Sequence, residues 1–180
     1  MLVVALITCF LPAMNIVGEK EAGTIEQINV TPVPKITFIV GKLIPYWVIG
    51  IVVLSVGMLV AWLLYGLRPE GSVLLLYGMS FLFIFGISGL GLIISNYSST
   101  MQQAMFMIFF IIIVFILMCG IFTPISSMPE WARVISLFDP FTYFAEIIRM
   151  IYLKGSSFKD ILPYVYPLLA FFVIILGWAI

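Results

Sequence analysis

The chain contains no histidine and is poor in charge of either sign. Of its 180 residues, eight are Lys or Arg and eight are Asp or Glu, so only 9% are charged and the net charge is zero. Soluble domains carry about 25% charged residues, so this composition argues against a soluble globular protein. A neutral chain also lacks the basic surface that nucleic acids attract, and we expect no nucleic-acid partner.

Cysteine is scarce as well, which limits the possible chemistry. Cys9 and Cys119 lie inside apolar runs, where a buried thiol is the usual role, and their spacing fits no metal site. Serines occur in such runs at Ser55, Ser80 and Ser88, but no histidine or carboxylate accompanies them there. A hydrolase needs an activated nucleophile with a base, and an ion-coupled transporter needs an ionisable group at mid-membrane. We therefore expect no enzyme activity, metal or bound cofactor.

Apolar residues are abundant: 64% of the residues are hydrophobic and the mean hydropathy is +1.28. Five apolar runs occupy residues 1–17, 36–65, 73–95, 104–122 and 161–180. A crossing takes about 20 residues, and lipid requires each backbone group to be paired within its own helix. The sequence predicts one all-α integral membrane domain over residues 1–180, with about five transmembrane helices. Because the last run has no charged flank, we expect a piece of a longer polypeptide.

Small residues recur at helical spacing within two of these runs. Gly57 with Ala61, and Gly91 with Ser95, form pairs four positions apart. Such pairs let membrane helices approach closely. We predict tight helix packing at both pairs.

A polar island, residues 18–35, interrupts the first two runs. It holds Glu19, Lys20, Glu21 and Glu26 within eight positions. Each charge costs roughly 3 kcal/mol at the centre of a bilayer, so the island must lie in water or against another protein.

The island also carries signals for a short helix. Residues 24–27 read T-I-E-Q, a capping box in which Thr24 and Gln27 satisfy free backbone groups. Gly23 gives the chain freedom to turn, and Pro32 stops the helix. We predict a helix over about residues 25–30; a solvated loop with one helical turn is the open alternative.

A second polar stretch, residues 123–159, is too polar to cross but has amphipathic pattern. One short helix is predicted over 129–138. Pro140 suits the first turn of another over 141–153, on which Glu146 and Arg149 are spaced to pair. This stretch is predicted to dip into the membrane or lie on its face.

Orientation follows from alternating the loops. Placing the island in the cytoplasm puts Lys20, Lys35 and Lys42 there and the other five basic residues outside. A plain count of positive charges favours the reverse. We expect the island inside, because the first loop often dominates and acidic residues balance the later segment.

Three stretches resemble one family. Residues 19–34, E-K-E-A-G-T-I-E-Q-I-N-V-T-P-V-P, followed by Gly41-Lys42, are similar to the E-x-E-x-G-T-x-E-x-L-x-x-T-P…G-K segment of permeases of the type-2 ABC export family. The resemblance continues at 120–131, G-I-F-T-P-I-S-S-M-P-E-W, and at 139–149, D-P-F-T-Y-F-A-E-I-I-R, ending at Lys154-Gly155. Two departures are Ile28 for the usual Leu, and Asp139 for the usual Asn before Pro140.

The resemblance implies an exporter of drug-like or lipid-like molecules in a bacterial or archaeal cell membrane. Partners would be cytosolic ABC ATPase subunits, which bind the ATP, a second permease copy or a paralogue, and membrane lipids. Segment 18–35 would be the coupling segment, and 123–159 the external re-entrant helices. The resemblance implies that typical members have a further first span and an external domain, and we expect this chain to be a fragment without them. The implied coupling residues are Glu19, Glu21, Gly23, Thr24, Glu26 and Pro32, and the implied re-entrant residues are Pro124, Pro129, Trp131, Pro140 and Arg149.

Two alternatives stay open at this point. One is a passive channel or membrane assembly protein without an ATPase, although the sequence shows no charged ring or carbonyl-filter motif of a channel. The spans also offer aromatic walls that suit an amphipathic substrate, but aromatic residues at helical spacing also face lipid. These residues are Trp47, Trp62, Phe81, Phe83 and Phe85.

Overall fold

The computed structural model describes residues 1–24 and 34–179, and within them every regular element is helical. Five of the described helices are long and apolar enough to cross a membrane, which confirms the predicted all-α membrane fold. They are α1 (Leu2–Glu21), α3 (Lys35–Tyr65), α4 (Val73–Tyr97), α5 (Met101–Met118) and α8 (Phe158–Ala179). Between α5 and α8 lie η1 (Ile125–Ser127), α6 (Glu130–Leu137) and α7 (Pro140–Lys154).

Several helices differ in extent from the apolar runs. Helix α1 continues through the first charges of the island to Glu21, and α4 continues to Tyr97. Helix α5 begins at Met101 because the Thr100 hydroxyl accepts from the Gln103 amide and caps it. The expected polar loop 96–103 is therefore only three residues long, 98–100. Helix α5 also ends before the predicted residue 122, and Gly120 just beyond takes a φ of +79°.

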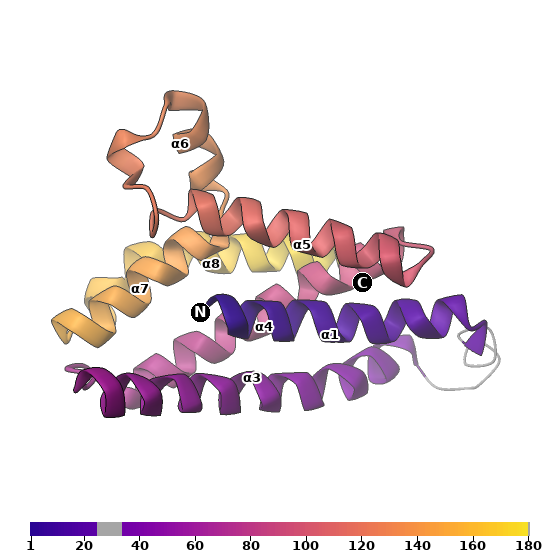
Figure 1. Ribbon diagram of the computed structural model, residues 1–180, viewed down its shortest axis with the longest axis horizontal. Helices are drawn as coiled ribbons and strands as arrows, with labels where there is room; N and C mark the ends of the chain where they lie inside the picture. The colour runs from indigo at the N-terminus through magenta and orange to yellow at the C-terminus, as the bar shows by residue number, and fades with distance from the viewer. Residues whose placement is uncertain (25–33, 180) are drawn as a thin grey trace.

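Helix α4 is the core of the bundle. It packs against α1, α3, α5, α7 and α8, and Figure 1 shows it crossing obliquely between them. The Phe83 ring on α4 is fully buried and stacks on the Phe144 ring of α7, with centroids 3.9 Å apart. A displacement of α4 therefore changes the packing of every other spanning helix in the described structure.

The two small-residue pairs have different outcomes. A Cβ added at Gly91 would lie 2.5 Å from the carbonyl oxygen of Cys9 on α1, so the predicted close packing there is confirmed. A Cβ added at Gly57 would meet no atom of another helix within 4 Å in the described structure, so the same prediction is wrong there for contacts within this chain. Gly57 and Ala61 instead line an apolar groove of about 500 Å³ beside the start of α1.

The loop between α3 and α4 is fastened to the end of α7. The backbone amides of Glu70 and Gly71 donate to the carbonyls of Tyr152 (3.2 Å) and Ile151 (3.1 Å). The Tyr152 hydroxyl donates in turn to the Leu67 carbonyl at 3.1 Å. This end of the bundle lies opposite the end of α1.

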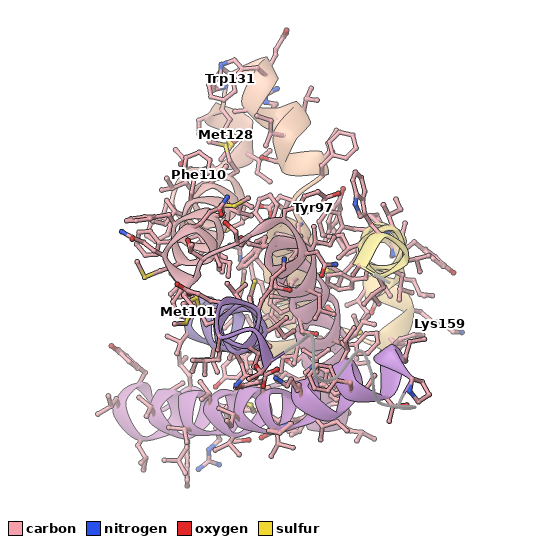
Figure 2. The ribbon with its side chains drawn as sticks, turned by 90° about the vertical axis from the view of Figure 1, so that its right-hand side faces the viewer. Tyr97, Met101, Phe110, Met128, Trp131 and Lys159 are labelled. Carbon is pink, nitrogen blue, oxygen red and sulfur yellow. The ribbon has the colours of Figure 1, made fainter. Side chains whose placement is uncertain are left out.

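The two predicted helices of the second polar stretch are present as α6 and α7. The Arg149 guanidinium binds the Glu146 carboxylate at 2.6 Å, so the predicted pairing is confirmed. Helix α7 buries Phe141, Phe144 and Ile151 against α4 and α8. Helix α6 projects away from the bundle, with Trp131 near its tip (Figures 1 and 2).

Candidate functional site

Three consecutive charged residues close α1, and each points to a different neighbour. Successive residues of an α-helix are about 100° apart, so Glu19, Lys20 and Glu21 face three directions. Glu19 forms a salt bridge with Lys42 on α3. The Lys42 ammonium also donates to the side-chain oxygen of Asn15, one turn earlier on α1, at 2.8 Å. The first contact of this site therefore joins α1 to α3.

Lys20 binds the carboxyl end of α4. Its ammonium donates to the carbonyl oxygens of Ser95 (3.2 Å), Asn96 (2.9 Å) and Ser98 (3.1 Å). The last carbonyls of a helix have no partner within it and carry a partial negative charge. An ammonium has three donors, and all three are used here. Lys20 thus acts as a cap supplied by another helix.

Glu21 binds the amino end of α5. Its carboxylate accepts from the backbone amide of Met101, the first residue of that helix, at 3.1 Å. Figure 2 looks along the bundle from this end and shows Met101 beside α1. A carboxylate at a helix N-terminus complements the free amides and the dipole. The base and the acid therefore hold the two ends of the short loop 98–100.

The chain turns immediately after this cluster. Gly23 takes a φ of +73°, and the Thr24 hydroxyl donates to the Glu19 carbonyl at 3.0 Å. The predicted capping box with Gln27, the helix over 25–30, Glu26 and Pro32 lie outside the described residues and stay predictions. The residues that hold α3, α4 and α5 therefore lie only a few positions before residue 25, where the described part of the island stops.

The sequence assigns Glu19 and Glu21 to docking, treats Lys20 and Lys42 only as cytoplasmic charges, and does not single out Asn15. The structure engages both carboxylates within the chain, on α3 and α5. The available signal was an acid–base–acid triplet at a helix end. It could not name the partners, because those of Lys20 are backbone carbonyls some 75 positions away.

The residues implied for the re-entrant segment do not gather at one place. Pro124 precedes η1, Pro129 precedes α6, and Trp131 on α6 is 63% exposed. Pro140 and Arg149 belong to α7, which packs inside the bundle. The structure therefore divides this set between a projecting helix and a packed one.

The link between α6 and α7 holds a buried carboxylate. Asp139 caps α7, accepting from the Phe141 amide at 2.9 Å and from the Thr142 hydroxyl at 3.0 Å. Burial raises the pKa of Asp139 from 3.8 to about 7, although these hydrogen bonds act to lower it. Native Asp139 thus holds its proton more tightly than the unfolded chain does. Its effect on stability therefore falls as pH rises from about 4 to about 7.

Replacing Asp139 with asparagine tests this. The amide oxygen still accepts from the Phe141 amide, and the amide nitrogen can donate to the Thr142 hydroxyl. We expect Asp139→Asn to keep the cap and to remove this part of the pH dependence of the thermal midpoint, measured at about pH 5 and about pH 8. Asp139→Ala is the control: it also removes the titrating carboxyl but loses the cap, so it should be about 1 kcal/mol less stable than Asp139→Asn at both pH values. An unchanged pH profile in the asparagine variant would contradict the assignment.

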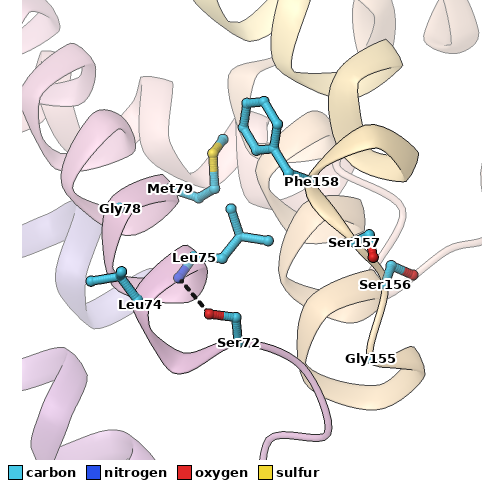
Figure 3. Close-up of a pocket in the computed structure, with 9 residues that line it drawn as sticks. All are labelled: Ser72, Leu74, Leu75, Gly78, Met79, Gly155, Ser156, Ser157 and Phe158. Atoms are coloured by element: carbon cyan, nitrogen blue, oxygen red, sulfur yellow. Dashed lines mark hydrogen bonds between the residues drawn. The ribbon is translucent and has the colours of Figure 1, made fainter.

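A cavity of about 610 Å³ lies at the opposite end of the bundle from Lys20. Figure 3 shows Leu75 and Met79 of α4 approaching Phe158 at the start of α8, with Ser72, Ser156 and Ser157 nearby. The Ser72 hydroxyl is occupied by the Leu75 amide at 3.4 Å. The cavity combines an apolar wall with hydroxyl groups, and its size is in the range of small-molecule sites.

The predicted aromatic walls are not a single surface. Phe83 is fully buried in the core, whereas Trp62 is about half exposed, with the Arg68 guanidinium 5.5 Å from its ring centroid. Trp47 packs on Phe85 and donates to the Ser88 hydroxyl at 3.1 Å. Phe83, Phe85 and Trp47 therefore contribute to helix packing in the described chain, whereas Trp62 and Phe81 are about half exposed.

These features define a class: a multi-pass helical membrane protein whose polar contacts gather at the ends of its helices. Across residues 1–24 and 34–179, no three His, Cys, Asp or Glu side chains lie where they could hold a metal ion. The sequence profile of the ABC-2 type transporter family matches residues 1–153. The chain belongs to that family, whose bacterial members lie in the inner membrane.

Three Escherichia coli K12 proteins are similar to this chain. The probable multidrug ABC transporter permease YbhR is 28% identical over 87% of the chain and 43% of its own length. YbhS, which is also described as a probable multidrug ABC transporter permease, is 29% identical over 86% of the chain and 41% of its own length. The inner membrane transport permease YhhJ is 27% identical over 93% of the chain and 45% of its own length. The chain thus spans less than half the length of these relatives.

Proposed function

We propose that this chain is the membrane-spanning permease part of an ATP-driven exporter, moved by separate cytosolic ATPase subunits. The observation that carries the proposal is the charged end of α1. Glu19, Lys20 and Glu21 gather the ends of α3, α4 and α5 at one point. The chain then enters the segment that resembles a coupling element. A push on that segment is delivered to several spanning helices together.

The orientation is part of the proposal, with the α1 end in the cytoplasm. The opposite end carries more basic residues, but two of them are engaged. Arg149 pairs with Glu146, and Arg133 donates to the carbonyls of Ile125 and Ser126. Lys20 and Lys42 at the α1 end are engaged as well, so the charge count does not decide the orientation, and the proposal rests on the resemblance of segment 18–35 to a coupling element.

The working unit we propose is a pair of permeases, identical or paralogous, with two ATPases. Amphiphilic molecules, drug-like or lipid-like, are the proposed cargo. Two relatives are described as probable multidrug permeases. The cavity beside Ser72 and Phe158 supports this cargo, because it offers hydroxyl groups next to apolar walls.

The docking role is tested by charge changes in the island. We expect Glu26→Lys to reduce co-purification with an ATPase encoded next to this protein by at least about tenfold, as for a central interface residue. Glu21→Gln removes the charge but keeps an oxygen for the Met101 amide, so it separates docking from the hold on α5. Glu70→Lys, exposed on the loop at the other end, is the matched control.

Two results would overturn the proposal. One is wild-type retention of the ATPase by the Glu26→Lys variant. The other is labelling of Thr24→Cys by an impermeant maleimide from outside the cell only. The second result is readable because Cys9 and Cys119 are both buried.

A further inference from the structure

We infer that Lys20 and Glu21 form a mechanical link from the coupling segment to α4 and α5, helices that do not adjoin that segment in the chain. The inference rests on the proposed function and adds a route to it. Sequence connectivity alone would deliver a push only to α1 and α3. Helix α1 also packs against α4 and α5 along its length, and the two side chains add a direct hold on the ends of those two helices.

Each charged side chain binds the helix end that carries the opposite partial charge. The Lys20 ammonium is held by three carbonyl oxygens around the end of α4 at 2.9–3.2 Å. The Glu21 carboxylate is held by the first amide of α5 at 3.1 Å. Only residues 98–100 lie between those two helix ends. Four hydrogen bonds therefore join the α1 end to this loop and to the helix ends beside it, and three of the four come from Lys20.

The loop has its own internal support, so it can transmit force. The Gln103 side-chain oxygen accepts from the amide and the hydroxyl of Ser99, both at 3.1 Å. The Gln103 amide donates to the Thr100 hydroxyl at 3.3 Å. A three-residue connection tied in this way has little slack.

A separate branch reaches α3 through Glu19 and Lys42. Helix α3 is scarcely buried in this chain, whereas half of the apolar window of α4 is buried. Helix α4 also contacts every other spanning helix. The lysine branch therefore reaches the core of the bundle, and the Glu19 branch reaches its edge.

The test needs a readout that a purely structural lysine would not change and that requires no known cargo. Spin labels are placed at Gln102→Cys on α5 and at Ile36→Cys on α3, both exposed positions. The protein is reconstituted in nanodiscs with its ATPase, and the label spectra are compared before and after ATP with vanadate. Lys20→Met removes three of the four hydrogen bonds of the link, and Lys20→Arg restores donors at a similar reach. Lys159→Met, on α8 at the opposite end, is the control.

In the wild type and in Lys159→Met we expect ATP to change both labels. In Lys20→Met the ATP-dependent change at residue 102 falls at least about fivefold, as for a lost coupling between sites, while residue 36 keeps its response. Lys20→Arg recovers most of the change at residue 102.

Two outcomes would overturn the link while leaving the proposed function intact. One is an unchanged response at residue 102 in Lys20→Met. The other is an equal loss at residues 36 and 102, which indicates a general disturbance. Failure of the wild-type protein to bind an ATPase would instead overturn the proposed function, and the link with it.

Discussion

Replacing Gly91 with alanine is expected to destabilise the bundle, although alanine is the better helix former. The added Cβ would lie 2.5 Å from the Cys9 carbonyl oxygen, and real Cβ atoms essentially never come so close to another atom. The obstacle is backbone, so α1 has to move away from α4 as a body. Overpacking of this kind costs about 1–3 kcal/mol. The thermal midpoint of the purified protein in detergent measures the loss.

Gly57→Ala is the matched control for this prediction. Gly57 also lies inside a spanning helix, but the described structure has nothing within 4 Å of its Cβ position. Alanine there gains up to about 1 kcal/mol of helix propensity without a clash. The same chemical change is thus expected to lower the midpoint at Gly91 and to maintain or raise it at Gly57. A shift in the same direction at both sites would contradict the packing described for α1 and α4.

These two glycines also show the limit of prediction from sequence. The pairs at Gly57 and at Gly91 have the same spacing and predicted the same packing. The pattern shows that one face of a helix carries small side chains, but it does not show which neighbouring helix packs against that face. Only the crossing of α1 and α4 distinguishes them.

The fold class was predictable because lipid allows few solutions. Long apolar runs must be helices, and the charges between them must leave the hydrocarbon. The ends of the helices were less predictable, because they depend on local chemistry. The Thr100 cap starts α5 three residues earlier than hydropathy suggests, and Gly120 follows an earlier end.

The site was predictable as a polar segment but not as a set of contacts. Hydropathy located the charges of residues 19–21, and the family resemblance suggested what they do. The bonds of Lys20 and Glu21 join residues some 75 to 80 positions apart, and the partner atoms belong to the backbone. Backbone partners leave no trace in the identity of the residues that supply them.

The largest loss of stability is expected from Phe83→Ala. The Phe83 ring on α4 stacks on Phe144 with the planes within 5°, and meets Phe141 edge-on at 5.3 Å. It also contacts Phe172 of α8, with centroids 6.4 Å apart. The Phe83 side chain therefore joins α4, α7 and α8, and the rings that meet there are all buried.

The physical cost of this change differs from that in a soluble core. Lipid tails are as apolar as the protein interior, so little hydrophobic transfer energy is at stake. What is lost is dispersion contact around a cavity that the rigid neighbouring rings cannot fill, together with the aromatic pairing. Soluble proteins lose about 3–5 kcal/mol in such changes. We expect a value toward the lower end here.

Phe81→Ala, two positions earlier on the same helix, is the comparison for Phe83→Ala. Phe81 is about half exposed, and its ring meets the ring of Trp47 edge-on, with centroids 6.1 Å apart. Its loss is expected to change the thermal midpoint only slightly, whereas Phe83→Ala lowers both the midpoint and the yield of folded protein. Phe83→Leu should lie between them, because leucine refills part of the volume. If Phe81→Ala proved as damaging as Phe83→Ala, the core would not lie where α4, α7 and α8 meet.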